Sequence, residues 1–184
     1  MLNEKMQSER TITDAEGGSL KDALVGGQID ALSFLTRIDD RDQSDPERSQ
    51  AEANLEILTD PTVANYFATQ KDPVAETKYH RLVSVAHFHI GQHLAFESNE
   101  NARIEFAEAL EAAENVPGDA SWRRYVKATL VYLDNIPVYL KAIYMTMPDD
   151  DKNKPIIRNF IEGLKKRSHP NYKEDYAAPR SEQI

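Results

Sequence analysis

The stretch KYHRLVSVAHFHIGQHLAFESNENARIEFAEALEAAE, from Lys78 to Glu114, decides the fold of this 184-residue chain. Apolar residues recur in it every three or four positions, a periodicity typical of amphipathic helices. We therefore predict one helix over residues 73–97 and a second over 99–115. The link between them is short, so the two helices should pack side by side and antiparallel.

Asp-Pro pairs at residues 45–46, 60–61 and 72–73 mark further helix starts. In each pair the Asp side chain can accept free backbone N–H groups, and proline lacks an N–H that would be unpaired at that position anyway. Pro137 favours a break before a helix over 137–147, because proline inside a helix removes a hydrogen bond and clashes with the preceding turn. The other predicted helices span residues 19–25, 28–38, 46–58, 61–70, 120–134 and 155–167.

Strand signals are almost absent, since the sequence has no long alternating β-branched runs and no Asn-Gly or Asp-Gly turns. We predict an all-α fold, in which antiparallel helical hairpins form a short repeat-like solenoid or a compact helical bundle. Residues 18–168 should form a single all-helical domain. Residues 1–17 are predicted to be disordered, and residues 169–184 to form an extended or disordered basic tail.

The composition is acidic, with a net charge of −9, and contains no cysteine. Disulfides and thiolate metal sites are therefore excluded, and the lack of cysteine fits a cytoplasmic protein. Neither a run of 18 apolar residues nor a basic start followed by an apolar stretch is present, so we expect no membrane span and no signal peptide. The acidic balance argues against nucleic-acid binding, which depends on clustered Lys and Arg.

Residues 87–114 resemble a tetratricopeptide repeat. Gly91 stands where that family places a small residue at the close crossing of its two helices, whereas His87 stands where the family often has Trp. The second helix fits the family's spacing of small and aromatic residues through Ala102, Phe106 and Ala109. The resemblance implies a scaffold that grips another protein or a peptide. A generic antiparallel bundle is the alternative.

An aromatic stripe follows a 3-4-3-4 spacing between residues 122 and 143. Such a stripe either belongs to the core or lines a groove for an extended or helical peptide. Tyr and Trp suit a groove because each combines a large apolar surface with one polar tip. The candidate partner-binding residues are Trp122, Tyr125, Tyr132 and Tyr139.

Four histidines fall in the predicted helix 73–97. Of these, His89 and His93 stand one turn apart, and Glu97 follows after one more turn on the same face. Two imidazoles at this spacing can chelate Zn²⁺ or another divalent ion, with the carboxylate as a third ligand. The alternative is that these histidines are half-buried and hydrogen-bonded within the protein.

No phosphate-binding loop, no G-x-S-x-G motif and no cysteine nucleophile occurs in the sequence. We therefore expect a non-enzymatic protein without a cofactor, which binds a protein or peptide partner as an adaptor, assembly factor or regulator. A helical-bundle metalloprotein that uses the histidine site is one alternative. A self-associating structural subunit is another, because a homo-oligomer is compatible with this sequence.

Overall fold

The computed structural model describes residues 20–44, 47–69 and 71–177. The segment 1–17 and the last part of the expected tail, residues 178–184, lie outside this description. Within the described residues every regular element is a helix, which confirms the predicted all-α fold. A short helix at 20–25 is followed by α3 (Ala31–Ser44), α4 (Arg48–Thr59), α5 (Pro61–Thr69), α6 (Pro73–Phe96), α7 (Ala102–Glu114), α8 (Ala120–Leu133), α9 (Pro137–Thr146), α10 (Lys154–Lys166) and α11 (Tyr172–Ala177).

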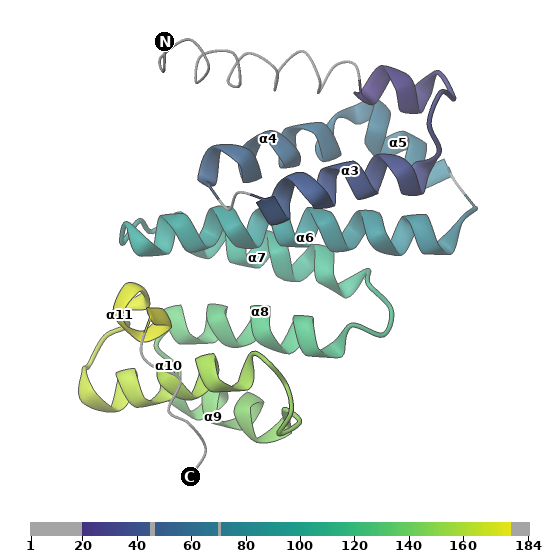
Figure 1. Ribbon diagram of the computed structural model, residues 1–184. Helices are drawn as coiled ribbons and strands as arrows, with labels where there is room; N and C mark the ends of the chain where they lie inside the picture. Colours follow the sequence, from purple (N-terminus) through teal and green to yellow (C-terminus); the bar gives the residue numbers. More distant parts are fainter. Residues whose placement is uncertain (1–19, 45–46, 70, 178–184) are drawn as a thin grey trace, which may run out of the picture.

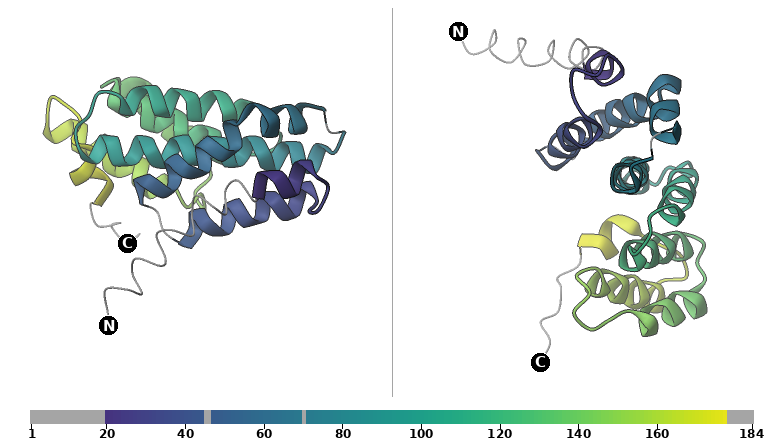
Figure 2. Two further views of the ribbon diagram at one scale, coloured as in Figure 1. Left: turned by 90° about the horizontal axis from the view of Figure 1, so that it is seen from above. Right: turned by 90° about the vertical axis from the view of Figure 1, so that its right-hand side faces the viewer.

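The helices from α3 to α8 are stacked in the order of the chain, and α11 returns to pack against α6 (Figure 1). Helices α3, α4 and α5 form one end, α6 and α7 cross the middle, and α9 and α10 form the other end. The right-hand view of Figure 2 shows the stack as elongated, with many of the helices seen nearly end-on. From α6 onward each helix packs against the next one in the chain, as the short links predict, whereas α3 and α4 pack mainly against α6.

Two groups of buried side chains make up the core, and α6 contributes to both. The first group lies among the segment 20–25, α3, α4, α5 and the first half of α6, and contains Phe34, Leu58 and Phe67. The second lies among the later part of α6 and α7 to α11, with Ala51 of α4, and contains Phe106 and Phe160. The 24-residue α6 thus joins the two ends of the stack.

The capping rule holds for the Asp-Pro pairs that the structure describes. The Asp72 carboxylate accepts the N–H groups of Val74 and Ala75 at 2.9 and 3.3 Å. Helix α6 begins at Pro73, directly after this aspartate. Asp60 accepts the Thr62 N–H at 2.9 Å at the start of α5. The pair at 45–46 lies outside the described residues, and α4 begins two residues beyond it.

Helix α3 begins later and ends later than residues 28–38, the predicted range. Asp30 sets the start, because its carboxylate accepts the backbone N–H of Ser33 at 2.9 Å and the Ser33 hydroxyl at 2.7 Å. The polar run 39–44 continues the helix, since it contains neither glycine nor proline.

The predicted break at Pro137 is confirmed. Helix α8 ends at Leu133 and α9 begins at Pro137. Between them, Asn135 adopts a φ of 57°, the left-handed conformation that asparagine tolerates better than most residues. The chain therefore reverses here, and α9 packs back against α8.

The α6–α7 hairpin is held by a close approach of the two helices. A Cβ atom built on Gly91 would lie 3.2 Å from the Phe106 ring, so the absence of a side chain makes room for this aromatic residue. The Ser84 hydroxyl of α6 also donates to the Ala109 carbonyl of α7 at 2.6 Å. Gly91 and Phe106, singled out by the sequence pattern, are therefore in contact.

The expectation of an extended tail from residue 169 is wrong for residues 172–177, which form α11. Tyr172 is buried, and its ring lies 5.4 Å from Phe96 and 5.5 Å from Phe160, measured between ring centroids. Asp175 is also buried and pairs with Arg167. A short helix is stable here because it completes the core, although its own sequence is mostly polar.

Candidate binding surfaces

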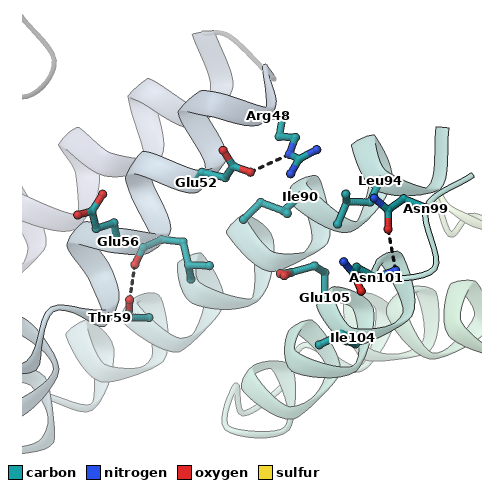
Figure 3. A pocket seen from close by; sticks show the side chains of 11 residues that line it. Arg48, Glu52, Glu56, Thr59, Ile90, Leu94, Asn99, Asn101, Ile104 and Glu105 are labelled. Carbon is teal, nitrogen blue, oxygen red and sulfur yellow. Dashed lines mark hydrogen bonds and ion pairs between the residues drawn. The ribbon is translucent and has the colours of Figure 1, made fainter. Parts of the chain in front are cut away.

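A groove opens between α4, α6 and α7, with a volume of about 580 Å³ (Figure 3). This volume lies within the range of about 300–1,000 Å³ that is usual for ligand sites. Side chains of α4 and of α7 stand on opposite sides, with Ile90 and Leu94 of α6 between them. We call it the α4–α6–α7 groove, and its lining residues are Arg48, Glu52, Leu55, Glu56, Thr59, Ile90, Leu94, Asn99, Asn101, Ile104 and Glu105.

The floor of the groove is apolar and its walls are polar. Ile90 and Leu94 are almost completely buried and provide the floor. Ile104 lies at the edge on α7 with 58% of its surface exposed. The groove therefore offers apolar contact surface within reach of solvent.

Charged side chains around the groove are mostly acidic. Arg48 pairs with Glu52 at 2.7 Å, one turn along α4, and with Glu97 at 3.4 Å across the gap to the end of α6. On the opposite wall, the Glu105 carboxylate lies 2.8 Å from the ring nitrogen Nδ1 of His87, within hydrogen-bonding distance. Glu56 stands one turn beyond Glu52 on α4 and is exposed.

A second surface lies on α9 at the far end of the stack. Val138, Tyr139 and Met145 are 75, 63 and 71% exposed, and Ile136 stands exposed just before the helix. The side chains at 138, 139 and 145 fall within about a third of the helix circumference. We call these four residues the α9 face. Its concentration of exposed apolar side chains on one short helix is characteristic of a contact surface.

The structure does not bring the four predicted aromatic residues together in a groove. Tyr125 and Tyr132 are 4 and 0% exposed, so neither can contact a partner. Trp122 is half-buried, donates from Nε1 to the Ser84 hydroxyl at 2.8 Å, and has the Arg81 guanidinium 4.0 Å above its ring. Tyr139, on the α9 face, is the one mostly exposed residue of the four. The core interpretation of the stripe therefore holds for α8, because α8 lies between α7 on one side and α9 and α10 on the other.

Tyr132 instead organises a buried polar network at the C-terminal end. Its hydroxyl donates to Asp175 Oδ2 at 2.5 Å and accepts the backbone N–H of Asn171 at 2.7 Å. Asp175 also pairs with the Arg167 guanidinium. Burial, followed by the hydrogen bond to Asp175, raises the pKa of the Tyr132 hydroxyl well above its ordinary value. The network ties α11 to α8 and to the end of α10.

The predicted metal ligands do not form a metal-binding group. In the described part of the chain no cluster of three or more His, Cys, Asp or Glu residues is placed to hold a metal ion. The His93 ring lies edge-on to Phe96, with 6.5 Å between the ring centroids, and the Glu97 carboxylate points to Arg48. His89 and His93 are half-buried among the side chains of the stack, as in the alternative interpretation.

Sequence reasoning missed the α4 wall of the groove. The signal was present, because Arg48, Glu52 and Glu56 repeat at a spacing of four on one face of α4, opposite its buried residues. Ile104 was a second signal, because it is an apolar residue on a different side of α7 from the buried residues Ala102, Phe106 and Ala109. Neither signal shows on its own that the two helices face each other across α6.

Among the described residues, no helix is both long enough and apolar enough to cross a membrane. The chain matches no protein-family model, no curated protein and no solved structure. The physical features of the two surfaces are therefore the basis for any functional conclusion.

Proposed function

We propose that this chain is a non-enzymatic helical interaction module that binds a peptide or helix of a partner protein in the α4–α6–α7 groove. It would act as an adaptor, assembly factor or regulator. The observation that carries this proposal is Ile104, a large aliphatic residue 58% exposed at the edge of a groove whose floor is also aliphatic. The proposal moves the binding site from the tyrosine stripe to the opposite side of the α6–α7 hairpin.

The shape and chemistry of the groove suit an amphipathic segment. An apolar side chain of the partner can pack against the exposed Ile104 and the partly buried Leu55, above the buried floor, which removes apolar surface of both molecules from water. Each large apolar side chain buried in this way contributes about 1.5–3 kcal/mol. Polar residues on the two walls then orient the segment, as in other complexes where a helix lies in a groove.

The resemblance of residues 87–114 to a tetratricopeptide repeat also belongs to this proposal. The antiparallel α6–α7 hairpin and the contact between Gly91 and Phe106 support it. A cytoplasmic location is proposed as well, and the lack of cysteine supports it.

The proposal is tested by affinity purification from native lysate, with mass spectrometry of the recovered proteins. Wild type is compared with Ile104→Arg, which places a charge at the groove edge, and with the matched control Val138→Arg on the α9 face. Both positions are exposed, so both variants should fold, which circular dichroism checks. We expect a partner that is lost with Ile104→Arg and retained with Val138→Arg. A partner retained by both variants would contradict the groove as its site.

The α9 face favours a second candidate function, self-association. Its four exposed apolar residues lie on or next to α9, whose single charged residue is Lys141, so two acidic molecules could meet there with little charge repulsion. Sedimentation across a range of concentrations would show an oligomer that Val138→Ser/Met145→Ser dissociates. A monomer at every concentration would remove this candidate.

A further inference from the structure

We propose that the segment held in the α4–α6–α7 groove is cationic as well as amphipathic, with Lys or Arg residues flanking the apolar side chain that enters the groove. This inference rests on the proposed function, since it specifies the partner of the same site. It follows from the charges on both walls and from their position relative to the apolar floor.

The α4 wall carries acidic groups at a regular spacing. Glu52 and Glu56 stand one turn apart, so their Cα atoms are about 6 Å apart along the helix axis. Both are exposed, and Glu56 has no basic side chain one turn away on α4. Arg48 is the single Lys or Arg among the lining residues, and it already contacts both Glu52 and Glu97. The wall therefore keeps a negative surplus that a cationic segment can neutralise.

The α7 wall presents a carboxylate on the other side of the same floor. Glu105 is partly buried, and its contact with His87 at 2.8 Å holds the carboxylate in place. A partner helix in the groove would thus pass between acidic groups on α4 and on α7. Basic residues on both flanks of its apolar stripe would match this arrangement, because a long Lys or Arg side chain can lie along apolar surface and place its charge at the rim.

The net charge of the whole molecule also favours a cationic partner. Its net charge of −9 accelerates the approach of a cationic segment and disfavours an acidic one. Electrostatic complementarity of this kind mainly determines which partner is selected and how fast it associates. The exposed apolar side chain of Ile104 supplies attraction, and the acidic walls supply selectivity.

The test uses three dye-labelled synthetic peptides of about 14 residues, a length that allows a helix to form on binding. They share one amphipathic pattern of Leu and a polar residue, which is Lys in the first, Gln in the second and Glu in the third. Binding to the full chain is followed by fluorescence anisotropy at about 50 and 500 mM salt, which changes the screening length about threefold. Amide shifts in NMR spectra locate the site.

Two charge variants separate the groove from the general acidity of the chain. Glu52→Gln/Glu56→Gln removes two negative charges from the groove, and Asp150→Asn/Glu162→Gln removes two exposed ones at the far end of the stack. We expect the Lys peptide to bind at least about tenfold more tightly than the Glu peptide, and the groove variant to weaken it about fivefold, the effect of losing two partly exposed ion pairs. The control variant should change its affinity less than about twofold.

Other outcomes overturn the inference in distinct ways. Equal weakening by both variants would show attraction to the acidic surface as a whole, and binding of the Gln or Glu peptide as tight as that of the Lys peptide would exclude a cationic preference. The proposed function would still stand in that second case if Ile104→Arg abolished binding. In the absence of peptide, amide NMR shifts of groove residues could grow with protein concentration and disappear in Glu52→Gln/Glu56→Gln. Such a result would overturn the inference by identifying a second copy of the chain as the occupant. No binding of any peptide would overturn the inference, while the affinity purification decides the proposed function separately.

Discussion

At the scale of single residues, tyrosine serves two opposite purposes in this chain. Tyr132 uses its hydroxyl inside the protein, where it joins Asp175 to the backbone of Asn171. Tyr139, seven residues later and on the same predicted stripe, is exposed on the α9 face. The spacing of a stripe identifies residues that share a side of a helix, but whether that side is covered depends on helices from elsewhere in the chain. The sequence therefore predicted the stripe correctly and could not separate its buried half from its exposed half.

Replacing Tyr132 by Phe should destabilise the fold by about 1–3 kcal/mol, because it leaves the buried Asp175 carboxylate without the hydroxyl that donates to it. Urea unfolding monitored by circular dichroism measures the change. The matched control is Tyr139→Phe, which removes an exposed hydroxyl and should change the free energy of unfolding by less than about 0.5 kcal/mol. Equal effects of the two variants would show that the network contributes nothing.

The buried tyrosines also predict a loss of stability in alkaline solution. Burial is the main reason why the pKa values of Tyr125, Tyr132 and Tyr172 are raised above the ordinary value of 10.0. Above that pH the unfolded chain releases the phenolic protons and the folded protein keeps them, so the stabilisation is complete below pH 10 and declines as the pH rises further. At about pH 11 each of the three should lower the free energy of unfolding by about 1.4 kcal/mol.

The measurement is the free energy of unfolding in urea at about pH 9 and pH 11, for wild type and for Tyr132→Phe. The decline should be shallower in the variant, which has one ionisable hydroxyl fewer. Identical declines in the two proteins would mean that Tyr132 does not keep its proton in the folded state.

At the scale of elements, most helices could be predicted from caps and periodicity, and α11 could not. The predicted starts at Asp60, Asp72 and Pro137 are accurate because each depends on local chemistry within one turn. Helix α11 has only six residues and follows Pro170, so local signals are weak. Its one signal was the pair Tyr172 and Tyr176 at a spacing of four, whose rings stack 5.5 Å apart. The stability of α11 comes from distant residues, which a local pattern does not reveal.

Tyr172→Ala should therefore destabilise the protein by about 3–5 kcal/mol, since it removes a buried aromatic ring from the second core group. Lys173→Ala, at the neighbouring exposed position of the same helix, is the control and should cost less than about 0.5 kcal/mol. Thermal or urea unfolding gives both values. A small effect of Tyr172→Ala would mean that α11 is dispensable for the core.

At the scale of the whole molecule, the stack of antiparallel helices could be predicted from the short links, because each helix meets its neighbours in sequence. The groove could not be predicted, since α4 and α7 are about 50 residues apart in sequence and become its two walls only because both pack against α6. Helix α6 also belongs to both groups of core residues, so the two ends of the stack should unfold together.

Phe34→Ala tests this coupling, because Phe34 is buried in the first core group. The single tryptophan, Trp122, packs against the second group and reports on it by fluorescence. We expect a loss of about 3–5 kcal/mol, seen equally by Trp122 fluorescence and by circular dichroism. A Trp122 transition unchanged by Phe34→Ala would show instead that the two ends unfold independently.

The central claim, that a partner lies in the α4–α6–α7 groove, is tested most directly by site-specific photo-cross-linking in cells that express the full chain. A photoreactive phenylalanine analogue is placed at Ile104 in one variant and at Tyr139 in another, two exposed positions at different ends of the stack. We expect a cross-linked partner protein at position 104 and none at position 139. A partner captured at position 139 with none at position 104 would contradict it.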